Sequence, residues 1–220
     1  ASSSNPVMLP RPFVLCDLRS GIKIDGRGNI TGFDEEAVSD LRELLNAAQS
    51  NGVKLILTIF DYSIAEGITG VKYNNGYGNI TQPLGEYREF ITDPEKREQL
   101  KNAVFNLFKE VQLSRYSCVI GFDIMNEPEW SRDGLDSGTK YVYDPAYTGV
   151  PQADLESFFA YFRDALYTDY SGKWVTIGHK DREELAYWSG INDVYQFHYY
   201  DWMASKPPHL PLGSRTAAGL

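Results

Sequence analysis

The sequence predicts an α/β fold built around a parallel sheet of about five strands. Short apolar runs alternate with segments whose apolar residues recur every three or four positions, a pattern typical of strands joined by crossover helices. The runs are continuously apolar, which indicates strands buried on both faces. Strands are expected at Pro12–Leu18, Val53–Phe60, Cys118–Met125, Trp174–Ile177 and Val194–His198. Nothing marks a second domain, so residues 1–220 are interpreted as one domain.

Helices are expected between these strands. Asp34 can cap a first helix that runs to about Ser50. A second helix opens at Thr92–Glu95 with a proline in its first turn, a third near Pro151, and a short one spans Arg182–Trp188. The stripes expected to face the core are Val38, Leu41, Leu45 and Ala48; then Leu100, Val104, Leu107 and Val111; then Leu155, Phe158, Phe159, Phe162 and Leu166. The glycine-rich stretch 21–32 is expected to be a turn, and the long connections 61–92 and 126–150 are expected to carry function.

Composition excludes several classes of function. A net charge of −9 and a pI of about 4.9 argue against a nucleic-acid partner, which needs a basic surface. No apolar run is long enough to cross a membrane. Cys16 and Cys118 each lie inside an apolar run and are expected to be core thiols, and no metal or cofactor motif is present. Ala1–Pro6 does not resemble a signal peptide, although a processed chain can still be secreted, and we expect a secreted or extracytoplasmic parent protein.

The strongest candidate site is the segment Asp123–Trp130, which contains Asn126-Glu127-Pro128 at the end of a buried strand. The alternative is a plain strand-to-loop turn in which the proline ends the strand. A carboxyl held at a strand end and partly desolvated suits general acid–base catalysis, as the hydrolysis of a glycosidic bond requires. Asn126 can hydrogen-bond a sugar hydroxyl. By strand parity Asp123 shares a side with Glu127, and a buried carboxylate there is expected to pair with an arginine.

A second candidate is the segment Phe197–Trp202, which also follows a strand. His198 and Tyr200 share a face and could orient a carboxylate, although a histidine among aromatic residues is more often a packing residue. Arg11 precedes the first strand and could pair with active-site carboxylates or simply be solvated, and Arg19 is its rival.

Aromatic residues on the expected loops suit binding to the apolar faces of sugar rings. Tyr62, Trp130 and Trp202 are the preferred candidates because each closely follows a strand, whereas Tyr73 and Tyr77 lie farther along a loop. Loop packing is the alternative for each of them.

The succession of these segments resembles the clan A glycoside hydrolases, the cellulase-like group. The resemblance covers about residues 11–209, and its specific part is Asn126-Glu127-Pro128 at its strand end. It implies a partial (β/α)8 TIM barrel and retaining hydrolysis of a β-linked polysaccharide or oligosaccharide, of the endo-β-glucanase or mannanase type. It also implies that Glu127 is the acid/base, beside Asn126, with His198, Tyr200 and Arg11 in the same catalytic site.

The sequence departs from that family pattern at both ends. The strand that normally precedes Phe13 has no counterpart, and neither do the last two strands, one of which carries the nucleophile glutamate of the family. The chain alone is therefore expected to be inactive, and the alternative function is non-catalytic carbohydrate binding on a truncated barrel. Exposed barrel edges also predict a homo-oligomer. A nucleotide-binding α/β protein is set aside because no phosphate-binding glycine loop is present.

Overall fold

The central feature of the chain is a five-stranded parallel sheet. The computed structural model describes residues 9–18, 21–65, 71–74, 79–82, 87–133, 149–180 and 182–198. The sheet has the order β1-β4-β7-β8-β9 and every neighbouring pair is parallel. Its strands are β1 (Phe13–Cys16), β4 (Leu55–Asp61), β7 (Val119–Asn126), β8 (Trp174–His179) and β9 (Gln196–Phe197). The strand order follows the chain order, as in a (β/α) barrel, so the predicted α/β fold with about five strands is confirmed.

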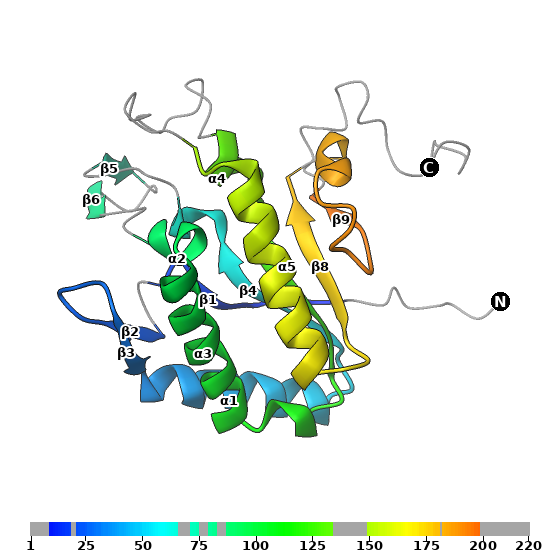
Figure 1. Cartoon of the computed structure of the whole chain (residues 1–220). Coiled ribbons are helices and arrows are strands. Elements are labelled where there is room, and N and C mark those ends of the chain that lie inside the picture. The colour runs from blue at the N-terminus through cyan, green and yellow to red at the C-terminus, as the bar shows by residue number, and fades with distance from the viewer. Residues whose placement is uncertain are drawn as a thin grey trace, which may run out of the picture.

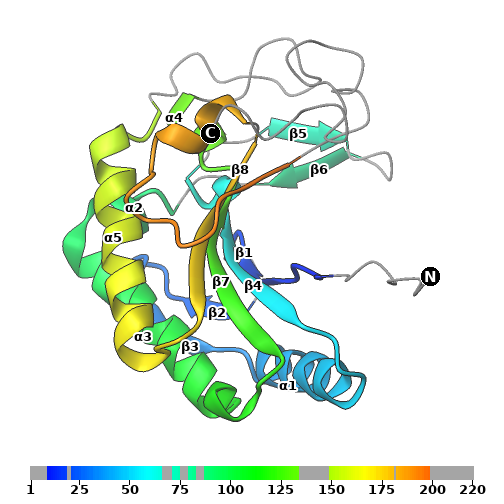
Figure 2. The same ribbon diagram turned by 90° about the vertical axis from the view of Figure 1, so that its right-hand side faces the viewer.

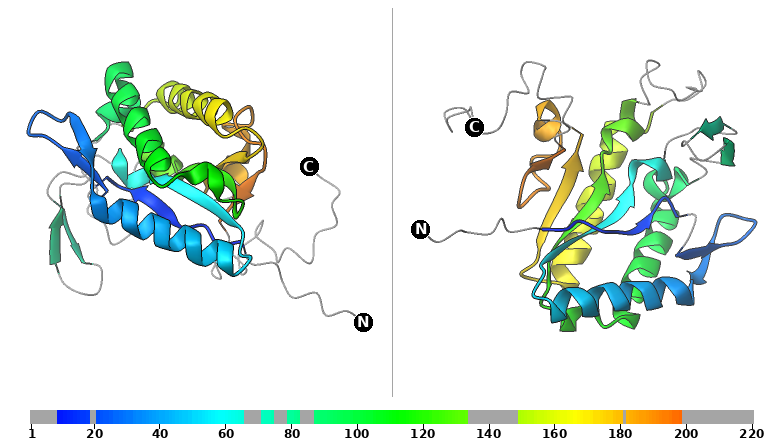
Figure 3. Two further views of the ribbon diagram at one scale, coloured as in Figure 1. Left: turned by 90° about the horizontal axis from the view of Figure 1, so that it is seen from below. Right: turned by 180° about the vertical axis from the view of Figure 1, so that it is seen from behind.

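Three long helices accompany the sheet (Figure 1). They are α1 (Glu35–Ser50), α3 (Pro94–Glu110) and α5 (Gln152–Asp169). Figure 2 shows α3 and α5 covering one face of the sheet. Seen from behind, in the right-hand view of Figure 3, α1 runs across the lower end of the sheet, and no other described helix crosses this face. This is the arrangement of part of a barrel, with helices outside and the other strand face turned inward.

The buried faces of the helices match the predicted stripes. The buried residues of α1 are the four predicted ones, and those of α5 are the five predicted ones. In α3 the predicted stripe is also buried, together with Ala103 and Phe108. The rings of Phe158 and Phe162 on α5 lie 5.8 and 5.3 Å from that of Phe60 on β4, centroid to centroid, and so join the helix to the sheet.

The helix starts are formed differently from one another. Asp93 caps α3, because its side chain accepts from the backbone N–H groups of Glu95 and Lys96. Asp34 precedes α1 as predicted, but its side chain does not cap the helix. It accepts instead from the backbone N–H of Gly21, at 3.1 Å, so it ties the preceding hairpin to the helix start.

The long connections hold structure that the sequence did not reveal. Stretch 21–32, predicted as a turn, contains strand β2 (Ile22–Ile24) and most of β3 (Ile30–Phe33), which form an antiparallel hairpin. Connection 61–92 contains η1 (Tyr62–Ile64), the hairpin β5 (Val71–Asn74) and β6 (Asn79–Gln82), and α2 (Glu89–Thr92). These strands are only three or four residues long, too short to show a clear alternation. The remaining short elements are η2 (Leu113–Arg115), α4 (Glu129–Asp133) and η3 (Glu183–Ala186).

Several predicted elements are shorter than expected, among them the first strand, which covers Phe13–Cys16 instead of Pro12–Leu18. The fifth strand covers only Gln196–Phe197, and the helix expected at Arg182–Trp188 is the 3-10 turn η3. Among the described residues β9 pairs only with β8, so it has backbone hydrogen bonds on one side only, and this favours a short strand. Neither Cys16 nor Cys118 forms a disulfide, and Cys118 is buried as predicted, whereas Cys16 is only partly buried. Burial raises the pKa of the Cys118 thiol. None of the helices in the described ranges has the length and apolarity needed to cross a membrane.

Candidate active site

The candidate site lies where the carboxyl ends of the parallel strands meet. Asn126, at the end of β7, is in register with Asp61 at the end of β4 and with Gly178 near the end of β8. His198 directly follows β9, and its backbone N–H donates to the carbonyl of His179 at 2.9 Å. The parallel arrangement therefore gathers polar residues from four strands at one edge, the edge that carries the chemistry in barrel enzymes.

Glu127 is held in an unusual backbone conformation immediately after β7. Its φ is 46°, in the left-handed region that non-glycine residues seldom occupy, and Pro128 disfavours helical conformations at the preceding residue. Its backbone N–H donates to the carbonyl of Gly178, at 2.6 Å. Such local strain persists only where surrounding contacts enforce it, and it concentrates at functional sites. Here the turn directs the Glu127 side chain toward His198.

The Glu127 carboxylate has a nitrogen partner at each oxygen. His198 Nδ1 is hydrogen-bonded to Oε1, and the Trp130 indole N–H donates to Oε2 at 2.8 Å. Glu127 is 7% exposed. The carboxylate is thus largely desolvated and held in one orientation, with a histidine able to exchange a proton with it.

A chain of hydrogen bonds fixes Asn126 beside Glu127. The Arg11 guanidinium pairs with Asp123 through Nη1 and donates from Nη2 to Asn126 Oδ1, at 2.7 Å. Asn126 Nδ2 donates in turn to Asp61 Oδ2, at 2.8 Å. The amide therefore has one orientation, with its oxygen toward Arg11 and its nitrogen toward Asp61. The sequence predicted an arginine partner for Asp123, and Arg11, one of its two candidates, is that partner.

Burial raises the pKa of both aspartates in this chain of hydrogen bonds, Asp123 and Asp61. Asp123 is fully buried and also accepts from Thr58 Oγ1 at 3.1 Å and from the Gly178 N–H at 2.9 Å. Burial raises its pKa, whereas Arg11 and these donors oppose the rise. Burial also raises the pKa of Asp61, opposed by the hydrogen bonds from Ser63 and Asn126, and the Glu127 charge adds to the rise.

Gly178 is required by the close approach of its neighbours. A β-carbon at this position would lie 2.5 Å from Arg11 Nη1, 3.0 Å from Asp123 Oδ2 and 3.2 Å from His198 Nε2. Only a residue without a side chain lets the ion pair and the histidine converge behind Glu127. Gly178 thus connects the Arg11–Asp123 pair to the Glu127–His198 pair.

The structure brings together four of the predicted catalytic residues: Arg11, Asn126, Glu127 and His198. Tyr62 and Trp130 lie near each other, with ring centroids 6.4 Å apart and an interplanar angle of 53°. The remaining predicted positions lie outside the described residues: Tyr200, Trp202, the rival Arg19, and the side chains of Tyr73 and Tyr77.

Several residues of the site were not singled out by sequence. Asp61 ends the apolar run of β4 just as Asn126 ends that of β7, so the shared strand-end position was a usable signal. Glu129 and His179 form a fully buried pair, with Nδ1 and Oε1 2.8 Å apart. No sequence pattern marks that pair or Gly178. Across the described ranges, no three or more His, Cys, Asp or Glu residues are grouped so as to hold a metal ion.

Comparisons with known proteins find similarity to carbohydrate-cleaving enzymes. No protein-family model matches the chain. A mannan endo-1,4-beta-mannosidase from Mytilus edulis is 24% identical over 210 residues, which covers 82% of this chain and 53% of that protein. The chain therefore spans about half the length of the curated relative that it matches.

Solved structures show the same fold. The β-mannanase of the blue mussel Mytilus edulis superposes with a TM-score of 0.60 at 21% identity, over 87% of this chain and 58% of that one. The β-1,4-mannanase of the sea hare Aplysia kurodai has a TM-score of 0.59 at 18% identity, over 85% and 57%. The endo-1,4-β-mannanase of Eisenia fetida has a TM-score of 0.54 at 23% identity, over 80% and 46%. The resemblance to clan A glycoside hydrolases is confirmed: the chain has the fold of part of a (β/α)8-barrel glycoside hydrolase and is similar to β-mannanases.

Proposed function

We propose that this chain carries the acid/base portion of a retaining β-1,4-mannan hydrolase, with Glu127 as the acid/base. The observation that carries the proposal is the Glu127 carboxylate, held at the carboxyl edge of the sheet by His198 and Trp130. Mannan is favoured over β-glucan because the relatives reported above are mannanases. A polysaccharide is too large to enter a cell readily, so we also propose that the parent protein acts outside the cell.

The geometry supports the following division of labour. Glu127 gives its proton to the glycosidic oxygen as the bond to the leaving sugar breaks, and in the second half-reaction it takes a proton from the attacking water. His198 holds the carboxyl and can exchange a proton with it. Asn126, fixed by Arg11 and Asp61, presents its amide toward a sugar hydroxyl. Tyr62 is proposed to contact the substrate ring, as is Trp202 outside the described residues. Tyr200, also outside them, is proposed to help His198 orient the Glu127 carboxylate.

Retention requires a second carboxylate about 5–5.5 Å from the acid/base. The other carboxylates that the described residues place around this end of the sheet already have other partners. Asp123 is buried against Arg11, Glu129 is buried against His179, and Asp61 accepts from Asn126 and Ser63. We therefore propose that the nucleophile lies outside the described residues, in a part of the protein that completes the barrel.

The test is to give the 220-residue protein mannohexaose and cellohexaose and to follow binding by calorimetry and reducing-end release from mannan. We expect binding of mannohexaose in preference to cellohexaose, without appreciable hydrolysis, because the carboxylates described at this edge of the sheet already have other partners. Failure to bind either sugar would contradict the proposal. Robust hydrolysis that Asp201→Asn abolishes would make Asp201 the nucleophile and overturn the division of labour proposed here.

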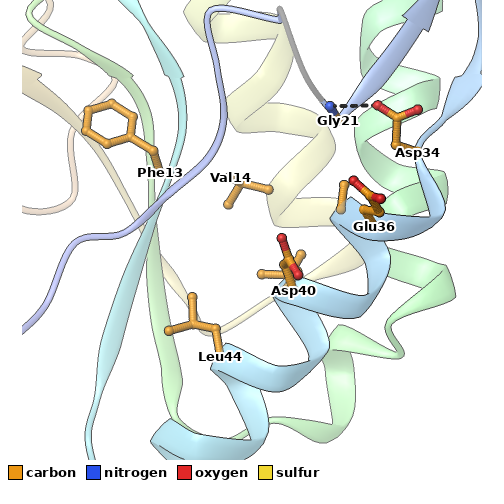
Figure 4. A pocket seen from close by; sticks show the side chains of 9 residues that line it. Phe13, Val14, Gly21, Asp34, Glu36, Asp40 and Leu44 are labelled. Carbon is orange, nitrogen blue, oxygen red and sulfur yellow. Dashed lines mark hydrogen bonds between the residues drawn. The ribbon is translucent and has the colours of Figure 1, made fainter. Parts of the chain in front are cut away.

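We further propose that the 220-residue chain self-associates through its sheet edges. β1 pairs only with β4 among the described residues, so its other edge has no described strand beside it. Phe13 on this edge is 44% exposed. A pocket of about 270 Å³ lies between β1 and α1. Figure 4 shows Val14 facing the α1 side chain Asp40, whereas the Phe13 ring points away from α1. An unpaired strand edge with apolar side chains favours pairing with another chain.

The expected result is a dimer or larger assembly of the 220-residue chain in light scattering at micromolar concentration. Phe13→Asp should shift the assembly toward monomer, because it places a charge at the edge. Asn106→Asp is the control, since it adds the same charge at an exposed position on α3, away from both edge strands of the sheet. A monodisperse monomer of the unmodified chain would contradict the proposal.

A further inference from the structure

Trp130 connects the candidate acid/base to a cation at the end of β8. Its indole N–H donates to Glu127 Oε2 at 2.8 Å, and the Lys180 ammonium lies 4.8 Å from the centroid of its ring. The Lys180 side chain is 21% exposed. A cation over an indole face is attracted by the ring's negative potential and draws electron density from it. Lys180 therefore both holds the ring and strengthens the N–H as a donor to the Glu127 carboxylate.

The contact between Lys180 and Trp130 is one of several between two chain segments. One segment is residues 178–180, at and just after the end of β8, and the other is residues 127–130, which follow β7. The Gly178 carbonyl accepts the Glu127 N–H; His179 pairs with Glu129, whose Oε2 also accepts the Lys180 N–H at 3.3 Å; and Lys180 covers Trp130. These contacts with residues 178–180 help to hold Glu127 in its left-handed backbone conformation.

We propose that Trp130 is a positioning residue for Glu127: its indole N–H, supported by Lys180 on the ring face, holds Oε2 and favours the charged carboxylate. A hydrogen bond from a neutral donor to a carboxylate stabilises the ionised form. With His198 on Oε1, the carboxylate cannot rotate away. The role in catalysis rests on the proposed function, whereas the coupling between Trp130 and Glu127 does not.

This role differs from the sugar stacking expected of Trp130 from its place in the sequence. A stacking platform needs a free ring face, and Lys180 already lies over one face of Trp130. The Tyr62 ring is 6.4 Å away and tilted by 53°, so it borders the indole without stacking on it. The N–H edge, which stacking does not use, is the part of Trp130 that contacts the candidate acid/base.

The proposal is tested by the indole N–H signals in nitrogen-15 correlation NMR spectra of the 220-residue protein. The chain has four tryptophans, and Trp130→Phe assigns the Trp130 signal. The titratable or charged groups around it come from four parts of the chain. They are Glu127, Glu129 and Arg132 on its own segment, Asp61 and Tyr62 at and after the end of β4, His179 and Lys180 at and after the end of β8, Glu184 of η3, which pairs with both Lys180 and Arg132, and His198 after β9. Trp174 is the internal reference, because it is 47% exposed at the start of β8.

In a pH titration the Trp130 indole proton is expected downfield of that of Trp174 and should move as Glu127 ionises. Glu127→Gln should abolish this movement and shift the signal upfield. Lys180→Met should also shift it upfield, whereas Lys180→Arg should restore it because it keeps the cation. A Trp130 signal that is unchanged by Glu127→Gln would overturn the proposal, as would one that titrates equally in Glu127→Gln. Failure of oligosaccharide binding alone would contradict the proposed function and leave this coupling standing.

Discussion

Replacing Glu127 with glutamine is expected to lower kcat/KM on mannan by roughly 10²–10⁴-fold in an active protein that contains this chain, the size of effect that general acid–base catalysis supplies. Glutamine keeps the shape of the side chain and can still accept from the Trp130 indole. It has no proton to give to the glycosidic oxygen, so cleavage of a bond with a poor leaving group slows most.

The dependence on the leaving group is what identifies the role of Glu127. An activated aryl mannoside departs with little protonation, so its glycosylation step should be far less affected by Glu127→Gln than that of mannan. Glu156→Gln is the matched control, because Glu156 lies on α5 and its recorded partner is the exposed Gln152. Full activity of Glu127→Gln on mannan would rule out the acid/base role, and unimpaired sugar binding without any catalysis in either form would favour the carbohydrate-binding alternative.

Replacing Arg11 with methionine is expected to lower the free energy of unfolding by about 3–5 kcal/mol, the usual cost of leaving a buried charge without its partner. Asp123 is fully buried, and Arg11 is its cationic partner. The change also removes the donor to Asn126 Oδ1. Chemical denaturation at pH 7 measures the loss, with Arg42→Met as control, because the recorded hydrogen bond of Arg42 is an exposed one to the Glu110 carbonyl.

The loss should depend on pH in a direction set by Asp123. Burial raises the pKa of Asp123 and Arg11 opposes that rise, so Arg11→Met should raise it further. When the folded-state pKa lies above the unfolded value, the folded protein binds more protons between the two values, and stability falls as pH rises. The destabilisation by Arg11→Met should therefore be smallest near pH 4, about the ordinary pKa of an aspartate, and should grow toward pH 7.

A second substitution separates charge from packing. Arg11→Met combined with Asp123→Asn removes the unpaired charge, so it should recover part of the stability at pH 7 and show a weaker pH dependence than Arg11→Met alone. An Arg11→Met protein that is as stable as the unmodified one at pH 7 would contradict the importance assigned to this ion pair.

The sequence predicted the elements that hydrophobic burial alone specifies. The continuous apolar runs of β4 and β7 and the stripes of α1, α3 and α5 were all found where expected, because their periodicity reflects which faces leave water. The short hairpins β2–β3 and β5–β6 were missed, since strands of three or four residues carry little periodicity. The cap predicted for Asp34 was wrong. Its side chain accepts a hydrogen bond from the backbone N–H of Gly21, thirteen residues earlier, and not from the first turn of α1.

For the site, the sequence by itself proposed Glu127 as the acid/base and correctly placed it at the end of a buried strand. Asn126-Glu127-Pro128 at the end of a buried run, followed two strands later by His198, was sufficient for that. The sequence also indicated that Asp123 would need an arginine, because an unpaired buried carboxylate is too costly. Whether the arginine was Arg11 or Arg19 was left open.

Only the tertiary structure decided how these residues are held. Arg11 and Asp123 are 112 positions apart, and His198 and Glu127 are 71 apart, so their contacts follow from strand order and register, which no local pattern encodes. The same holds for Gly178, whose missing side chain leaves the space that Arg11, Asp123 and His198 share. It also holds for Trp130, which lies three residues after Glu127 and contacts Lys180, the residue that follows β8. Local sequence fixes which side chains leave water, whereas the packing of distant strands fixes which polar groups meet once they have left it.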